Sequence, residues 1–126
     1  MLESRPIFTL TQNLEVFMSN TIETIKQQIE QNDILLYMKG SPNQPMCGFS
    51  ARTVQAVMEC GQRFAFVDIL TNQDIRAELP AYANWPTFPQ LWIKGELVGG
   101  CDIIIELHES GELKTMIEAG TSEQNA

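Results

Sequence analysis

A run of five consecutive apolar residues, ILLYM at 34–38, places the tightest limit on how this chain can fold. A segment so short and so uniformly apolar is typical of a central strand that is covered on both faces. Just after it, Gly40, Pro42 and Pro45 predict a loop that ends at Cys47. The fold must therefore supply layers of other elements on both sides of this strand.

A helix is predicted directly ahead of this strand. Ile22, Ile25 and Ile29 recur on one helical face. Asn20 and Glu23 form a capping pattern, so we expect an amphipathic helix that begins at Asn20.

A second helix and a second strand follow the loop. The helix begins at Cys47 and ends at Gly61, and residues 65–69 form the next strand. A strand, a helix and a strand in this order predict a parallel crossover. Residues 72–82 form a short helix.

The last part of the chain predicts a hairpin and two helices. Residues 91–93 and 97–98 flank Gly95 closely enough for an antiparallel hairpin. Helices are expected from Asp102 to about Glu109 and over 111–118. The predicted architecture is α/β, a small mixed sheet with helices on both faces.

Length and charge limit the function classes. The 126 residues fit one compact domain. Eight basic and sixteen acidic residues give a net charge of −8, and no basic stripe is present, so we expect no nucleic-acid partner. Three cysteines, an odd number without framework spacing, indicate a reducing compartment, which we take to be the cytoplasm.

The two ends of the chain are predicted to differ from the middle. In residues 1–17 the apolar residues are scattered among polar ones, which does not fit a leader or a membrane span. We treat this segment as an extension that lies upstream of a native start at Met18. Residues 18–119 form the domain. Residues 120–126 are small and polar and are expected to be a disordered tail.

One reactive thiol is predicted where a redox pair would have two. In the run Cys47-Gly48-Phe49-Ser50, a serine stands where a Cys-x-x-Cys site carries its second thiol. A helix start points unpaired N–H groups at Cys47, and Lys39 adds a positive charge nearby, so the thiolate is favoured. The alternative is that Cys47 is a small loop residue. A lone reactive thiol must recruit its partner sulfur from elsewhere.

The other two cysteines do not obviously fill the gap. Cys60 follows Cys47 on the same predicted helix, which separates them by about 20 Å. A disulfide tolerates a Cα separation of about 7 Å, so we interpret Cys60 as buried and inert. Whether Cys101 approaches Cys47 stays open.

Three further residues are expected to be structural. His108 lies about two helical turns from Cys101 and cannot share a metal with it, so we interpret it as a surface or packing residue. Trp85 and Trp92 lie beside strands, where packing is favoured over ligand contact.

Four sequence blocks occur in order along the chain: Lys39-Gly40, Cys47-Gly48-Phe49-Ser50, Trp85-Pro86-Thr87-Phe88-Pro89-Gln90 and Gly99-Gly100-Cys101-Asp102. Together they resemble the monothiol glutaredoxins with a Cys-Gly-Phe-Ser site, of the single-domain bacterial type. The resemblance covers about residues 20–118 and implies a thioredoxin-like fold with a four-stranded mixed sheet. It leaves residues 1–17 unexplained.

The resemblance implies a glutathione site. Lys39 and Arg76 would meet the glycine carboxylate of glutathione, and a cis Pro89 would leave the backbone of Phe88 free to pair with the cysteinyl part. The alternatives are that Lys39 and Arg76 are solvated surface charges and that Pro89 only breaks regular structure in a loop.

The same resemblance implies a second anchor for the other end of glutathione. Gly100 lies in a tight turn, and Cys101 and Asp102 at the next helix start would hold the γ-glutamyl group. A strand end and a simple helix N-cap are the structural alternatives.

Two functions remain for the thiol. An all-thiolate [2Fe–2S] cluster takes four sulfur ligands, so Cys47 from each of two chains and two glutathiones would complete a homodimer that transfers clusters. The resemblance implies roles in iron–sulfur biogenesis and iron homeostasis, with BolA-type proteins and apo iron–sulfur proteins as partners. The alternative is that Cys47 reduces protein–glutathione mixed disulfides, a reaction at which the family is poor. A third class is a glutathione-dependent interaction module without either chemistry.

Overall fold

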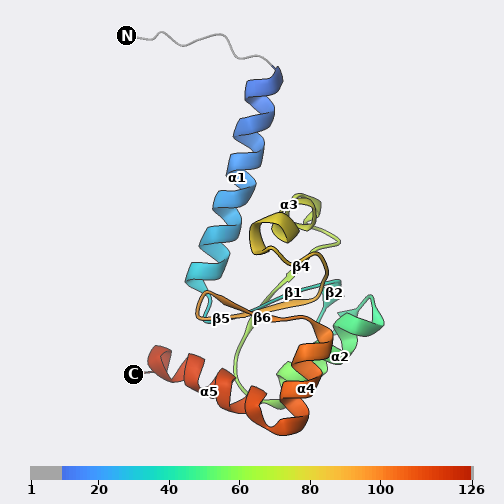
Figure 1. Ribbon diagram of the computed structural model, residues 1–126, viewed down its shortest axis with the longest axis vertical. Helices are drawn as coiled ribbons and strands as arrows, with labels where there is room; N and C mark the ends of the chain where they lie inside the picture. Colours follow the sequence, from blue (N-terminus) through green and yellow to red (C-terminus); the bar gives the residue numbers. More distant parts are fainter. Residues whose placement is uncertain (1–9, 126) are drawn as a thin grey trace.

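The computed structural model describes residues 10–125. A four-stranded sheet of order β4-β1-β5-β6 crosses its middle (Figure 1). The strands are β1 (Ile34–Met38), β4 (Ala65–Asp68), β5 (Gln90–Ile93) and β6 (Glu96–Gly99). All five residues of β1 are buried, which confirms the central strand predicted from its apolar run.

The sheet is mixed, as predicted. β1 runs parallel to β4, with Leu35 opposite Ala65, and antiparallel to β5, with Leu35 opposite Trp92. The crossover between β1 and β4 contains one helix, which is the connection that parallel neighbours require. β5 and β6 form the predicted antiparallel hairpin, with an irregularity in register between Leu91 and Trp92.

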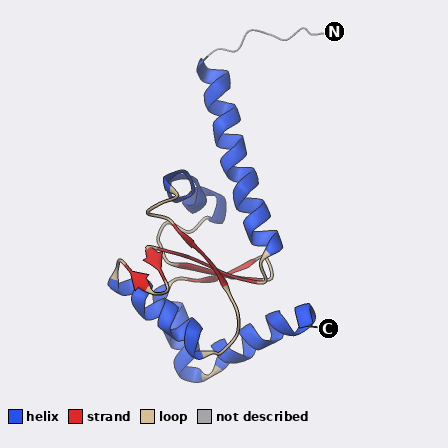
Figure 2. Ribbon diagram, turned by 180° about the vertical axis from the view of Figure 1, so that it is seen from behind, coloured by secondary structure: helices blue, strands red, loops and turns tan. Residues whose placement is uncertain are grey.

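Helices cover both faces of the sheet. α1 (Leu10–Gln31) and α3 (Gln73–Ala83) pack together on one face. α2 (Gly48–Glu59), α4 (Cys101–Ser110) and α5 (Glu112–Asn125) lie on the other face, and the view from behind shows the same two layers (Figure 2). Among the described residues, no helix is both long and apolar enough to cross a membrane.

The alternating side chains of β1 divide the core into two clusters. Leu35 and Tyr37 pack toward α1 and α3, together with Ile25, Ile75 and Leu79. The other cluster lies toward α2, α4 and α5, and its members include Ile34, Leu36, Met38, Val54, Val57, Leu91, Ile104, Leu113 and Ile117. Successive residues of a strand point to opposite faces, so one apolar run supplies both clusters.

The loop between β1 and α2 contains a small hairpin that the sequence did not predict. β2 (Gly40–Ser41) pairs antiparallel with β3 (Gln44–Pro45). Gly40 has φ +92°, and a Cβ there would lie 2.7 Å from Met46 N, so this turn requires glycine. The N–H of Met46 donates to Lys39 O at 2.9 Å, which returns the chain to the end of β1 just before Cys47.

The predicted start of the first helix at Asn20 is wrong. α1 begins at Leu10 and continues through Met18, and the Asn20 carbonyl accepts a hydrogen bond from Thr24 Oγ1 at 2.9 Å. Helical spacing in the sequence continues through the capping pattern at Asn20, as the series Leu14, Phe17, Thr21 and Ile25 shows. The rest of the predicted extension, residues 1–9, lies outside the described residues.

The last helix, expected over 111–118, is longer than predicted, because α5 continues to Asn125. Gly120 is buried against the sheet, and a Cβ there would lie 2.8 Å from Ile93 Cγ2 and 3.1 Å from Ile34 Cδ1. Thr121 is 6% exposed, and its hydroxyl donates to Ile117 O at 3.2 Å. Because Gly120 has no side chain, the helix can approach the strands closely.

Gly120→Ala is expected to lower the free energy of unfolding by about 1 kcal/mol, because the overpacking penalty exceeds the helix-propensity gain. At an exposed helical position the same change would stabilise by about 1 kcal/mol. Urea denaturation checks the sign, with the exposed Lys114→Ala as a control that changes little. A stabilised Gly120→Ala protein would show that α5 does not pack on the sheet.

Candidate functional site

Cys47 is the N-cap residue of α2 and has extended backbone geometry, with φ −159° and ψ 140°. Its carbonyl accepts the first helical hydrogen bond, from Ala51 N at 2.9 Å. The β2–β3 hairpin before it and the helix after it fix this position. The thiol is thus held where the free N–H groups of the first turn converge.

The surroundings of Cys47 lower the pKa of its thiol. The backbone N–H of Ser50 has the largest effect, and partial burial opposes it by favouring the neutral thiol. The N–H of Phe49, the positive charge of Lys39 and the Ser50 hydroxyl lower the pKa further. The direction agrees with the prediction from the helix start, and the thiolate is favoured.

Ser50 has a structural role that the sequence analysis missed. Its side chain is fully buried, and its Oγ accepts a hydrogen bond from the backbone N–H of Lys39 at 3.0 Å. The residue that replaces a second thiol therefore joins α2 to the end of β1. It also holds the backbone of Lys39, whose charge favours the Cys47 thiolate.

The pH profile of alkylation tests the thiol. The iodoacetamide reaction of Cys47 is expected to have a midpoint below about 8.5, the value of an unperturbed thiol. A lowered pKa leaves more thiolate at pH 7, so the rate falls only when the pH drops through the lowered pKa. Lys39→Met is expected to raise the midpoint because it removes a positive charge. Mass spectrometry of the alkylated peptides assigns the rate, and a midpoint at or above 8.5 would contradict the prediction.

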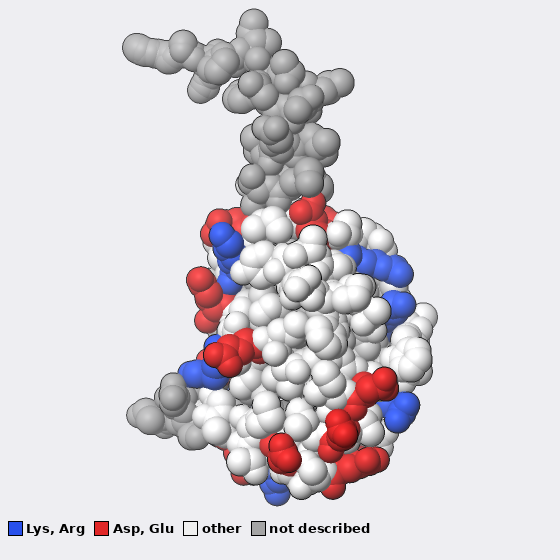
Figure 3. All heavy atoms as spheres, in the orientation of Figure 1, with Lys and Arg blue, Asp and Glu red and all other residues white. Residues whose placement is uncertain are grey.

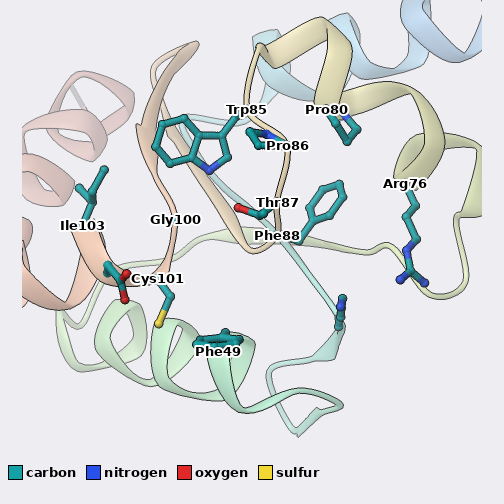
Figure 4. A pocket seen from close by; sticks show the side chains of 12 residues that line it. Phe49, Arg76, Pro80, Trp85, Pro86, Thr87, Phe88, Gly100, Cys101 and Ile103 are labelled. Carbon is teal, nitrogen blue, oxygen red and sulfur yellow. The ribbon is translucent and has the colours of Figure 1, made fainter.

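A pocket of about 740 Å³ lies between the two helical layers. Six of the predicted site residues line it, and Figure 4 shows Arg76 on one side and Cys101 and Ile103 on the other. The lining is Lys39, Phe49, Arg76, Pro80, Trp85, Pro86, Thr87, Phe88, Gly100, Cys101, Asp102 and Ile103. Cys47 does not line it, but Phe49, from the first turn of the same helix, does.

The charges in the pocket have opposite signs at its two ends. Lys39 follows β1 and Arg76 lies on α3, whereas Asp102 lies in the first turn of α4. The protein carries a net charge of −8, and on the face shown in Figure 3 acidic side chains gather over the lower part of the molecule. Lys39 and Arg76 therefore form a basic wall in a protein that is acidic as a whole. Such a wall is suited to binding the carboxylate of a ligand.

Gly100 and the residues around it form a tightly packed wall. The Phe88–Pro89 peptide bond is cis, as the resemblance implied, and Pro89 is buried. A Cβ at Gly100 would lie 3.3 Å from Pro89 O and 3.3 Å from Trp85 Nε1. The Nε1 atom of Trp85 is buried without a hydrogen-bond partner in the described part of the chain. Gly100 leaves room for the α4 start to meet this wall.

The two tryptophans differ. Trp92 is 7% exposed in the core and donates from Nε1 to Gln90 Oε1 at 3.2 Å, which confirms the packing prediction. Trp85 lines the pocket as well as packing on Gly100, so packing alone does not describe it. The sequence block that Trp85 shares with Pro86, one of the four that resemble the family, could have indicated that Trp85 lies at the site.

The remaining cysteines and the histidine lie in distinct environments. Cys60 is 3% exposed in the core, and burial raises the pKa of its thiol, so it is the inert cysteine expected. Cys101 begins α4 and is 8% exposed at the pocket wall. His108 Nε2 lies 2.8 Å from Glu59 Oε1 between α4 and α2, a structural contact as expected. Within the described residues, no three His, Cys, Asp or Glu side chains form a metal site.

Comparison with known proteins identifies the family. The family model described as Glutaredoxin matches residues 34–98. Glutaredoxin 4 of Escherichia coli strain K12 is 69% identical over 101 residues, which cover 80% of this chain and 88% of that protein. The chain belongs to the glutaredoxins. With one thiol in the Cys47-Gly48-Phe49-Ser50 run, it is a monothiol glutaredoxin close to glutaredoxin 4.

Solved structures support the fold of this glutaredoxin. Reduced apo GrxS14 of poplar matches with a TM-score of 0.69 at 41% identity, over 79% of this chain and 92% of that one. A buckwheat glutaredoxin–glutathione complex matches with a TM-score of 0.74 at 22% identity, over 86% and 96% of the two chains, which shows the fold alone. The mixed sheet with helices on both faces is the predicted thioredoxin-like fold.

Proposed function

We propose that this glutaredoxin binds glutathione in the pocket between its helical layers. Lys39 and Arg76 would meet the glycine carboxylate, and the backbone of Phe88, before the cis bond to Pro89, would pair with the cysteinyl part. These residues offer the cations and free backbone groups that the tripeptide needs. The membership of the chain in the glutaredoxin family supports glutathione as the ligand.

The γ-glutamyl end would bind at the start of α4. Gly100 lines the pocket without a side chain, so the ligand can approach its backbone. Cys101 begins the helix, and Asp102 presents a carboxylate for the ligand amine. Lys39 and Arg76 would face the glycine carboxylate and Asp102 would face the γ-glutamyl ammonium group, which would set the direction of the tripeptide.

The proposed activity is the binding and transfer of a [2Fe–2S] cluster. The observation that carries it is the single accessible thiol of lowered pKa, Cys47, at the helix start beside this pocket, while Cys60 is buried in the core. A [2Fe–2S] centre takes four sulfur ligands. Cys47 of two chains and two bound glutathiones would supply the four thiolates, so the donor set fits a cluster shared by a homodimer.

A shared cluster suits delivery because half of its ligands are exchangeable. We infer a role in iron–sulfur biogenesis and iron homeostasis in the cytoplasm, with BolA-type proteins and apo iron–sulfur proteins as partners. The resemblance of the chain to monothiol glutaredoxins supports this role. The protein acts mainly as a carrier and at most as a weak thiol–disulfide oxidoreductase.

Anaerobic reconstitution with iron, sulfide and glutathione tests the proposal. The expected product is a coloured dimer, seen by visible absorption and size-exclusion chromatography. Omitting glutathione should leave a colourless monomer because two of the four ligands are then missing. A coloured monomer, or a full yield of cluster without glutathione, would overturn the proposal.

The lowered pKa of Cys47 favours one alternative activity. The thiolate would attack the glutathione sulfur of a protein–glutathione disulfide and release the protein thiol. A second glutathione would then attack the Cys47 mixed disulfide, release glutathione disulfide and regenerate the thiolate. Rapid turnover of a glutathionylated protein by a chain that stays colourless in reconstitution would favour this activity over cluster transfer.

A further inference from the structure

Asp68 joins two segments that reach the pocket, although it does not line the pocket itself. It is the last residue of β4 and lies opposite Met38, the last residue of β1. Its Oδ1 accepts hydrogen bonds from two backbone N–H groups, Gly40 at 2.9 Å and Leu70 at 2.8 Å. One carboxylate oxygen thus connects the start of the β2 segment to the turn that follows β4.

The first of these bonds fixes the backbone around Lys39. Beyond the end of β1, the N–H of Lys39 donates to Ser50 Oγ at 3.0 Å and the N–H of Gly40 donates to Asp68 Oδ1. Side chains from α2 and from β4 therefore hold two consecutive N–H groups. The Lys39 side chain, which lines the pocket, branches from the backbone between these two hydrogen-bonded N–H groups.

The second set of bonds fixes the start of α3. The main-chain carbonyl of Asp68 accepts from Asn72 N at 3.1 Å and from Asn72 Nδ2 at 2.8 Å. Asn72 is the N-cap residue of α3, and its carbonyl accepts from Arg76 N at 3.1 Å. The turn closed by Asp68 and Leu70 therefore leads directly to the helical turn that carries Arg76.

We propose that Asp68 is a positioning residue that sets the placement of Lys39 relative to Arg76. Its carboxylate thereby determines how strongly the pocket selects ligands that end in a carboxylate. This inference rests on the proposed glutathione site, in which the two basic side chains meet the glycine carboxylate. Without the Asp68 acceptor, two N–H groups lose their partner and the loop that carries Lys39 is free to shift.

A purely structural role for Asp68 makes a different prediction. General loosening of the fold would weaken every ligand of the pocket alike. Loss of positioning would weaken only ligands that use the basic wall. Glutathione and its monoethyl ester on the glycine carboxylate form a suitable pair, because the ester keeps all three residues and loses only the negative charge at that end. The dissociation constant of glutathione divided by that of the ester separates the two explanations.

The experiment titrates the full reduced chain with each ligand by anaerobic NMR. Asp68→Ala is expected to weaken glutathione binding about tenfold and binding of the monoethyl ester less than about twofold. Asp68→Asn retains an oxygen acceptor, so it should preserve the wild-type ratio. Glu109→Ala removes an exposed acidic side chain on α4 and should also preserve it. In a Lys39→Met, Arg76→Met background, Asp68→Ala should no longer change the ratio.

Each other outcome has a defined meaning. Equal weakening of both ligands, or no change in either, would overturn the positioning role while glutathione binding by the wild-type protein still stands. Failure of the wild-type protein to bind glutathione would overturn both proposals. If Asp68→Ala does not fold, Asp68→Glu replaces it. Its carboxylate is displaced by one methylene, so the ratio should rise about threefold, and an unchanged ratio would overturn the inference.

Discussion

Replacing Cys47 by serine is expected to abolish the glutathione-dependent cluster and its dimer completely. The thiol at the start of α2 has a lowered pKa and is the proposed iron ligand of each chain. A serine hydroxyl stays protonated at neutral pH and is a poor ligand for iron, so two of the four positions on the cluster are lost. Visible absorption and size-exclusion chromatography after anaerobic reconstitution measure the loss.

The other two cysteines provide matched controls. Cys60→Ala should retain the full cluster yield, because Cys60 is buried in the core and away from the helix start. Cys101→Ser should also retain the cluster, because Cys101 is proposed to line the glutathione site. Loss of the cluster in Cys101→Ser, or its retention in Cys47→Ser, would show that the ligand is assigned to the wrong cysteine.

Gly40→Ala is expected to lower the free energy of unfolding by about 3 kcal/mol. Gly40 has φ +92°, which an L side chain rarely adopts, and its Cβ would contact the backbone atoms Gln44 O and Met46 N. Backbone atoms cannot move aside as a side-chain end can, so the β2–β3 hairpin must distort. Since this hairpin leads to Cys47, the alkylation rate of the thiol should also fall. Urea denaturation and alkylation at pH 7 measure the two effects.

Gly48→Ala is the matched control, although Gly48 belongs to the Cys47-Gly48-Phe49-Ser50 run. A Cβ at Gly48 would meet no heavy atom within 4 Å, and its φ is not in the left-handed region. In the first turn of α2, this change is expected to stabilise the protein by about 0.5 kcal/mol. If both substitutions cost the same, the sterics at Gly40 would not explain its effect.

The sequence predicted the central elements because their patterns are local. The apolar run 34–38 became β1 with its predicted bounds, and the strand, helix and strand order led to the parallel pair of β1 and β4. The ends of the chain were predicted less well. The capping pattern at Asn20 lies inside a helix, and Gly120 packs on Ile93 across the fold. Contacts between distant residues decide such positions, and no short pattern reveals them.

Most of the site residues predicted from the sequence line one pocket, although Cys47 and Pro89 do not. The supporting hydrogen bonds were not predicted. Ser50 was interpreted as a missing thiol, yet its hydroxyl holds the backbone of Lys39. Asp68 carried no motif at all, because its role depends on a bond to Gly40 that only the folded chain brings within reach.

The division of the core into two clusters has a consequence for heat stability. One cluster supports the pocket wall that carries Arg76, and the other supports the wall that carries Cys101 and Phe49. A molecule that contacts both walls of the pocket connects the parts of the chain that pack in the two clusters. Because it binds the native chain and not the unfolded one, occupancy raises the melting temperature as its concentration rises. A fragment that contacts a single wall should bind more weakly, so at the same concentration it should raise the melting temperature less.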